Sequence, residues 1–115
     1  MSAIQSFEDI EAWQYAKKLT LGIYAEFKNS KDYSFRDQIQ RASVSIMNNI
    51  AEGFERQSNK DFRKFLYISK GSCGEVRSML RLAIELGYIE SQRAANLIML
   101  ATRISRMLAG FIKKL

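Results

Sequence analysis

Residues that could carry out chemistry are few in this sequence, and their types exclude the common catalytic and metal centres. The chain of 115 residues contains no His and one Cys, Cys73. A zinc site built from Cys and His, a Ser-His-Asp triad and a Cys-His pair each require residues that are absent. One cysteine also excludes a disulfide within the chain. Cys73 is therefore interpreted as a small core residue, and we expect neither a cofactor nor an enzymatic activity.

Basic side chains form the set of functional groups with the clearest pattern. At heptad spacing they line one face of the helix expected over residues 60–86, together with one aromatic residue: Lys60, Arg63, Tyr67, Lys70, Arg77 and Arg81. Such a face suits a nucleic-acid backbone with one stacked base. The same pattern also fits a solvated helix face, or a face that pairs with acidic residues of a neighbouring helix.

Charge is distributed unevenly along the chain, whose net charge is +6. Up to Phe35 there are 4 basic and 5 acidic residues, whereas from Arg36 onward there are 14 basic and 7 acidic residues. Arg103 and Arg106 belong to a final segment, from Ser91 onward, that has no acidic residue. This excess favours an anionic partner such as RNA, DNA or a membrane surface, although many proteins are mildly basic without a specific partner.

Helices must position these residues, because the sequence has no Pro, only 6 Gly, and apolar residues at helical spacing. We expect helices over about residues 7–27, 35–56, 60–86 and 91–114. Short loops make neighbouring helices antiparallel, so the prediction is an all-α, up-down-up-down four-helix bundle in one domain, residues 1–115. The initial segment MSAIQSFEDIEAW lacks the pattern of a signal peptide, and no 18-residue apolar run is apparent. We therefore expect a cytoplasmic protein that does not contact a membrane.

Residues suited to the ends of helices lie at the expected boundaries. The predicted N-terminal caps are Ser6, Ser34, Asn59 and Ser91, whose short polar side chains can accept hydrogen bonds from the first turn. Gly87 is predicted to end the third helix, because glycine readily adopts the left-handed conformation found there.

Polar and small residues interrupt the apolar pattern of the second and third helices. Asn49 and Glu52 could form a polar site in a cleft, but we favour a structural pair that holds the second helix against another helix. Gly71 and Gly74, on either side of Ser72 and Cys73, cost about 1 kcal/mol each relative to Ala inside a helix. Close approach of a neighbouring backbone would compensate for that cost.

Aromatic residues lie outside the main apolar seams of the first three helices: Trp13, Tyr15, Tyr24, Phe54 and Phe65. A single small bundle has limited interior for them, and exposed apolar area of this kind marks an interface. We therefore expect a homo-oligomer, of which a cyclic dimer is the commonest form in general. Trp13 could instead be a stacking platform for a base, although a lone Trp at helical spacing is more often a core or interface residue.

Residues 38–75 resemble the 23S rRNA intervening-sequence protein family, also called the four-helix-bundle protein family. The matching residues are Gln38, Arg41, Ala42, Ser45, Ile46, the run Asn49-Ile50-Ala51-Glu52-Gly53-Phe54, Arg56, Phe65, Leu66, Gly71, Ser72 and Glu75. Ala12, Trp13, Ala16 and Tyr24 match the first helix of the family, so the resemblance covers about residues 7–90. The sequence departs at Met47 and Lys28, where the family usually or often has Pro, so a kink and a stiff turn are missing.

The resemblance implies a bacterial four-helix bundle that assembles into a ring-like homopentamer. The family's genes were first noticed inside insertions in large-subunit rRNA genes. Its fold and quaternary form are similar to those of the accessory protein of diversity-generating retroelements, which binds RNA and a reverse transcriptase. By this analogy the expected partner is nucleic acid, RNA rather than DNA. The alternative is a scaffold whose basic face meets an acidic protein.

Overall fold

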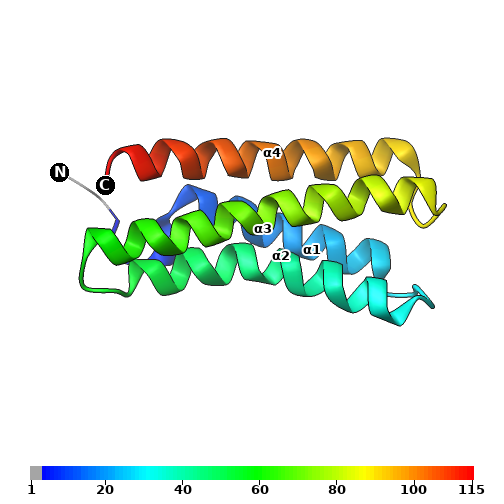
Figure 1. The fold of residues 1–115 in the computed structure, drawn as a ribbon, viewed down its shortest axis with the longest axis horizontal. Helices are drawn as coiled ribbons and strands as arrows, with labels where there is room; N and C mark the ends of the chain where they lie inside the picture. The colour runs from blue at the N-terminus through cyan, green and yellow to red at the C-terminus, as the bar shows by residue number, and fades with distance from the viewer. Residues whose placement is uncertain (1–3) are drawn as a thin grey trace.

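Four α-helices, preceded by a short 3₁₀ turn, make up the protein in a computed structural model that describes residues 4–115. The elements are η1 (Phe7–Asp9), α1 (Glu11–Phe27), α2 (Tyr33–Phe54), α3 (Asn59–Glu85) and α4 (Ser91–Lys113) (Figure 1). The first three residues of the initial segment considered above lie outside the described residues. The predicted all-α class is confirmed.

The helices run alternately up and down the bundle, as Figure 1 shows. Each helix packs against the next, and α4 closes the bundle against α1, whereas the diagonal pairs α1–α3 and α2–α4 do not approach closely. The α2–α3 pair is the most extensive and the α1–α4 pair the least. The bundle measures 46 × 22 × 19 Å, and α3, the longest helix with 27 residues, extends along its long axis (Figure 1). The predicted up-down-up-down arrangement is confirmed.

The core consists of the apolar heptad positions of all four helices. Its largest fully buried side chains are Phe27, Ile10, Leu19, Ile23, Ile39, Ile46, Ile50, Leu66, Leu80, Ile104, Leu108 and Val76. Small residues complete it where helices come close: Ala16, Cys73, Ala83, Ala94 and Ala101. Apolar residues three and four apart share one face of a helix. The buried apolar residues of α3 and α4 therefore determine which faces of these two helices point outward.

Three of the predicted N-terminal caps are wrong by one or two residues. Asp32, not Ser34, caps α2, and its Oδ1 accepts from the backbone N–H of Phe35 at 3.1 Å. Ser58 and Glu90 cap α3 and α4 in the same way, where Asn59 and Ser91 are already the first helical residues. The cap is the last residue before the helix with a non-helical backbone, and the chain path into each helix decides which residue that is.

Residues adjacent in the sequence determine where the first helix begins and where the third helix ends. The backbone N–H of Ser6 donates to Asp9 Oδ2 at 3.3 Å across η1, and α1 begins only at Glu11, so the predicted helix from residue 7 is interrupted at Ile10. Gly87 has φ of +74°, the left-handed conformation predicted for the end of the third helix.

Glycines in contact with neighbouring helices are not the ones that the sequence suggested. A Cβ at Gly71 or Gly74 would meet nothing within 4 Å, so no neighbouring helix among residues 4–115 approaches them closely. A Cβ at Gly53 would lie 2.7 Å from Phe65 Cβ, and one at Gly22 would lie 2.9 Å from Leu97 Cδ2. Gly22 and Gly53 therefore permit close packing of α1 on α4 and of α2 on α3.

The α4 helix is long and apolar enough, by length and composition, to cross a membrane, with a mean hydropathy of 1.2 over its best window. This corrects the expectation that no segment qualifies. In the bundle, α4 supplies six buried residues to the core: Ala94, Ile98, Ala101, Ile104, Leu108 and Ile112. A core helix meets the same criteria, so the composition of α4 is weak support for a membrane span. On the outward side Met99 is 70% exposed.

Candidate functional site

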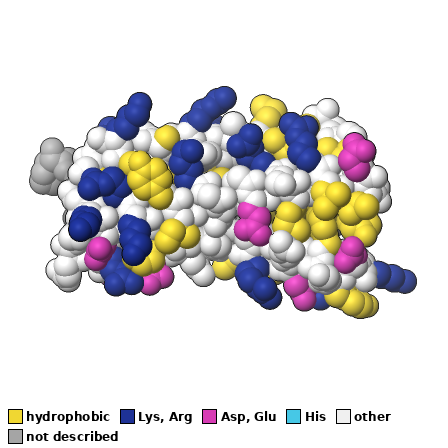
Figure 2. Space-filling view, in the orientation of Figure 1, with side chains coloured by type: hydrophobic (Ala, Val, Ile, Leu, Met, Phe, Trp, Pro, Cys, Tyr) yellow, Lys and Arg dark blue, Asp and Glu magenta, His cyan; other side chains and the backbone are white. Residues whose placement is uncertain are grey.

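The cations predicted for α3 all lie along one side of that helix. Lys60, Tyr67, Arg77 and Arg81 are exposed, and Arg63 and Lys70 are half-buried. Gly74 occupies the position between Lys70 and Arg77 in the same heptad row. We call these seven residues the α3 stripe. At 1.5 Å per residue its length is about 32 Å. Figure 2 shows one face of the molecule in the orientation of Figure 1. On this face Lys and Arg side chains are spread over α3 and α4, and acidic side chains are sparser.

The α3 stripe has no acidic partner within the part of the chain that the structure describes. The ion pairs among residues 4–115 join Arg36 to Asp37, Arg56 to Glu52, and Arg93 to both Glu26 and Glu90. The five cations of the stripe belong to none of these pairs. Of the two alternatives raised by the sequence, pairing with acids of a neighbouring helix is therefore wrong, and the stripe is left free for solvent or an external anion.

Tyr67 lies within the stripe and is 59% exposed. The four residues one helical turn away from it are Arg63, Lys64, Lys70 and Gly71, so three of its neighbours are basic and the fourth has no side chain. Among residues 4–115 no ring contact or hydrogen bond involves Tyr67. The ring is thus available on a cationic surface.

Arg103 on α4 does not join the stripe. The Arg103 guanidinium Cζ is 4.5 Å from the centroid of the Tyr15 ring on α1, and Lys18 Nζ is 5.9 Å from the same centroid. Because α1 and α3 lie diagonally across the bundle, this cluster faces the α1–α4 side. Arg106 is exposed one turn further along α4. Of the eight predicted binding residues, Arg103 therefore lies on a different surface from the α3 stripe.

Polar residues on the opposite edge of α3 form a ladder to α2. Ser45 and Ser72 hydroxyls are 2.9 Å apart, and Gln38 Nε2 donates to Glu75 Oε2 at 3.4 Å. Asn49 Nδ2 donates to the carbonyl and the hydroxyl of Ser45, at 2.8 and 3.0 Å. Asn49 therefore reaches α3 through Ser45.

Glu52 does not share in this ladder. It pairs instead with Arg56 at 3.0 Å on the surface of α2. The predicted pairing of Asn49 with Glu52 is thus wrong, although Asn49 has a structural role. Four residues apart on one helix, Glu52 and Arg56 are ordinary neighbours, so the ion pair follows from local spacing.

An open groove of about 630 Å³ adjoins the ladder. Its lining residues come mainly from α2: Ser34, Asp37, Gln38, Arg41, Ala42, Ser45 and Glu75. Sequence reasoning did not assign a site here, although Gln38, Ser45 and Glu75 are among the residues that carry the family resemblance. Their spacing along α2 and α3 was the available signal, but only the pairing of the two helices brings them together.

Comparison with known proteins identifies the family and the fold of this chain. The sequence profile described as "23S rRNA-intervening sequence protein" matches residues 8–110. The chain belongs to this family. The fold is also similar to the 1.70 Å crystal structure of a protein of unknown function from the S23 ribosomal protein family of Bacteroides thetaiotaomicron, with a TM-score of 0.83 and 26% identity. That similarity covers 89% of this chain and 98% of the other. No curated protein matches the sequence.

In this member of the 23S rRNA-intervening sequence protein family, the single thiol is not poised for chemistry. Cys73 is buried, and burial raises the pKa of its thiol to about 12, with the nearby charges of Lys70 and Arg77 acting in the opposite direction. A thiol that stays protonated at neutral pH is a poor nucleophile. Within residues 4–115 no cluster of three or more His, Cys, Asp or Glu could hold a metal ion.

The predicted interface aromatics divide into packed and exposed residues. Trp13 packs edge-on against Phe7 with ring centroids 5.2 Å apart, and Phe54 packs similarly against Phe62 at 6.0 Å. Tyr24 is 43% exposed on the α1–α2 side. The ring of Phe65 is half-buried, and Arg56 Cζ lies 4.7 Å from its centroid. Part of the apolar surface predicted to need an interface is thus accommodated by the bundle itself.

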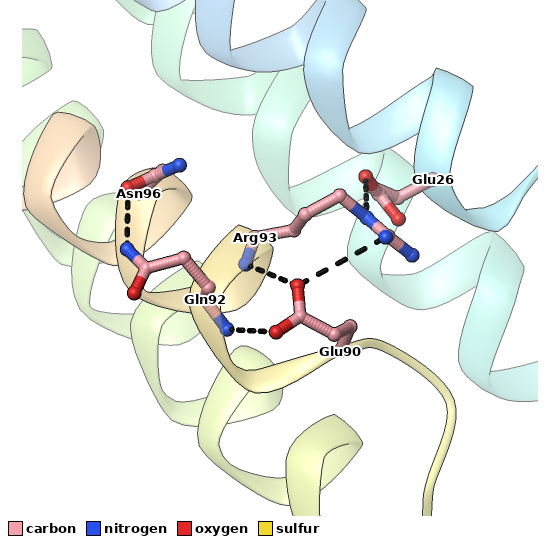
Figure 3. Close-up of polar contacts among 5 residues, drawn as sticks. All are labelled: Glu26, Glu90, Gln92, Arg93 and Asn96. Atoms are coloured by element: carbon pink, nitrogen blue, oxygen red, sulfur yellow. Dashed lines mark hydrogen bonds and ion pairs between the residues drawn. The ribbon is translucent and has the colours of Figure 1, made fainter.

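The α1–α4 side is joined at one end by the polar cluster in Figure 3. Arg93 Nε donates to Glu26 Oε2 at 2.9 Å, which links the start of α4 to the end of α1. Glu90 accepts from the backbone N–H groups of Gln92 and Arg93, and these two bonds lower the pKa of Glu90. This cluster fixes the end of the bundle remote from the chain termini (Figure 1).

Proposed function

We propose that this protein is a non-enzymatic homo-oligomer of the cytoplasm that binds nucleic acid through the α3 stripe. The observation that carries the proposal is a row of five cations on one helix face with no acidic partner among the described residues. When unpaired cations in a line bind a polyphosphate backbone, they release the counterions that were condensed on the phosphates. This release makes the association favourable.

RNA is the preferred nucleic acid in this proposal. The family takes its name from an rRNA intervening sequence. The similar fold of a retroelement accessory protein that binds RNA points the same way, as an analogy between folds.

Self-association is the second element of the proposal, and the family resemblance favours a pentamer. Several apolar side chains on α3 and at its C-terminal cap are about half exposed: Ile68 45%, Leu82 49% and Leu86 47%. Burial of such residues between copies stabilises an assembly by about 25 cal/mol per Å² of apolar area. A ring would also repeat the α3 stripe around its axis, so several weak phosphate contacts could act together through effective concentration.

The alternative function is a protein-binding scaffold. The same exposed Ile68, Leu82 and Leu86 could meet another protein, and an acidic partner could neutralise the stripe. Dependence on salt discriminates the two functions, because phosphate contacts give a steep, linear fall of log affinity with log salt.

Fluorescence anisotropy of a labelled RNA, titrated with protein at several salt concentrations, tests the proposal. The variant Lys70→Gln/Arg77→Gln/Arg81→Gln should reduce the salt slope by about 2, since each lost contact to a single strand removes about 0.7. The control Lys28→Gln/Lys31→Gln/Lys113→Gln removes the same charge from exposed positions outside α3 and should leave the slope nearly unchanged. Equal losses in both variants, or no binding by the wild type at low salt, would contradict the proposal.

A further inference from the structure

We propose that the α3 stripe takes a single-stranded polynucleotide, with one unpaired base stacked on Tyr67. This inference rests on the proposed function and narrows it, because a basic surface by itself accepts single strands and duplexes alike. The reasons lie in the surroundings of Tyr67, in its contrast with the other tyrosines, and in the row of cations along one side of α3.

The surroundings of Tyr67 match those of a stacking platform. The ring is 59% exposed, and the residues three and four positions away are Arg63, Lys64, Lys70 and Gly71. A base stacked on the ring would have cations on both sides for the flanking phosphates. A Cβ at Gly71 would meet nothing within 4 Å among the described residues, so this side of the ring has room for a base.

The other tyrosines are less available than Tyr67. The rings of Tyr15 and Tyr33 each lie near an Arg guanidinium, whose Cζ is 4.5 and 4.9 Å from the respective centroid. Tyr88 packs edge-on against a phenylalanine at 5.3 Å. In the described part of the chain Tyr24 also has no ring contact, but it is only 43% exposed and lies in a groove lined by both Asp37 and Arg41. Of these two uncovered rings, Tyr67 is the more exposed, and three of the four residues one turn from it are basic.

A single strand fits this row better than a duplex does. The five cations follow one side of α3 for about 32 Å, at successive spacings along the helix axis of about 4.5, 10.5, 10.5 and 6 Å. At Gly74, between Lys70 and Arg77, a Cβ would meet nothing within 4 Å, so a sugar-phosphate chain can lie close to the helix there. In a duplex the base faces are hidden within the stack, so only an unpaired base can reach Tyr67. Single-strand binding sites combine these same features, a track of cations and an aromatic platform.

Binding of a labelled RNA of about 12 nucleotides and of the same sequence as a duplex tests the inference. The wild type should prefer the single strand. Tyr67→Leu should weaken single-strand binding about fivefold or more while leaving the salt slope unchanged, because stacking is lost and no charge is removed. Tyr67→Phe, which keeps the ring, should retain wild-type affinity. Tyr33→Leu removes a tyrosine that is 61% exposed on α2 and serves as the matched control.

Each outcome of this experiment supports or overturns the inference. Equal affinity of the wild type for single strand and duplex overturns it without any variant, as does wild-type affinity of Tyr67→Leu. The proposed function survives both results, provided that the affinity of the triple Gln variant for RNA still depends less steeply on salt than that of the wild type. A DNA strand of the same sequence shows whether the sugar contributes, since stacking and phosphate contacts are common to RNA and DNA. Circular dichroism and light scattering on Tyr67→Leu should match the wild type, and a changed assembly would assign Tyr67 to an interface instead.

Discussion

Gly53 and Gly71 are both helical glycines, but their surroundings differ completely. A Cβ at Gly53 would lie 2.7 Å from Phe65 Cβ and 3.3 Å from the Phe62 carbonyl oxygen, whereas one at Gly71 would meet nothing within 4 Å. Gly53→Ala should therefore lower the free energy of unfolding by about 1–3 kcal/mol, because backbone and side chains must shift. Gly71→Ala should raise it by up to about 1 kcal/mol, because alanine favours the helix.

Urea denaturation of the two variants checks this pair of predictions. The same substitution in the same bundle makes each variant the control for the other. A loss of stability or a change of assembly in Gly71→Ala would contradict the prediction and would show that a second copy packs against that glycine.

Asn49 acts within the ladder between α2 and α3. Its side chain donates to both oxygens of Ser45, whose hydroxyl lies 2.9 Å from that of Ser72. Asn49→Leu should lower the free energy of unfolding by about 1 kcal/mol, the usual value of such bonds, and leave RNA affinity intact. Thermal denaturation and anisotropy measure the two effects. Retained stability and assembly with abolished binding would place Asn49 in a binding site instead.

At the scale of elements, the loop between α1 and α2 and the turn between α3 and α4 are tied together by one hydrogen bond. Tyr88 Oη donates to Asp32 Oδ2 at 2.7 Å. This bond, and then the backbone N–H of Phe35, lower the pKa of Asp32. The same bond raises the pKa of Tyr88. The α2 cap and the start of the α4 connection are thus coupled through two groups that titrate at opposite ends of the pH scale.

The direction of each pKa shift predicts the pH range in which this hydrogen bond stabilises the fold. The Asp32 contribution is present above its unfolded pKa of about 3.9 and is lost as pH falls through the lower folded value. The Tyr88 contribution is present below about pH 10 and is lost as pH rises through the higher folded value. Tyr88→Phe keeps the ring against Phe35 and removes only the bond.

Melting temperatures measured across the pH scale check this prediction. The difference between wild type and Tyr88→Phe should be largest near neutral pH and shrink toward both extremes. Glu90, whose pKa is also lowered, is common to both proteins and cancels in the difference. A difference independent of pH would show that the bond does not couple to either titration.

At the scale of the whole molecule, the number of chains in the assembly determines how many copies of the α3 stripe lie close together. Light scattering should give a mass well above the 13.3 kDa of one chain, and close to five times that value if the family resemblance holds. The reason is the apolar area left exposed on α3 and α4, where Ile68, Leu82 and Met99 are 45–70% accessible. A monomer whose mass is independent of concentration would remove both the ring and the cooperative contacts built on it.

The sequence by itself determined the features that depend on helical periodicity. Apolar residues three and four apart gave the core positions of α3, among them Leu66, Cys73 and Leu80, and the same periodicity placed Lys60 to Arg81 on one outward side. Gly87 could be predicted because the left-handed conformation at a helix end favours glycine whatever lies around it. These features are local, so the residues within two turns specify them.

Only the tertiary structure decided which residues of different helices meet. Periodicity cannot tell Gly53, pressed against α3, from Gly71, which faces solvent, because the neighbouring atoms come from distant parts of the chain. For the same reason Arg103 lies against Tyr15 and apart from the α3 stripe, and Ser45 meets Ser72 from 27 residues away. The caps shifted by a residue or two because the path of each loop sets where the backbone leaves the helix. Contacts of this kind depend on the distances and angles between packed helices, which no single stretch of sequence contains.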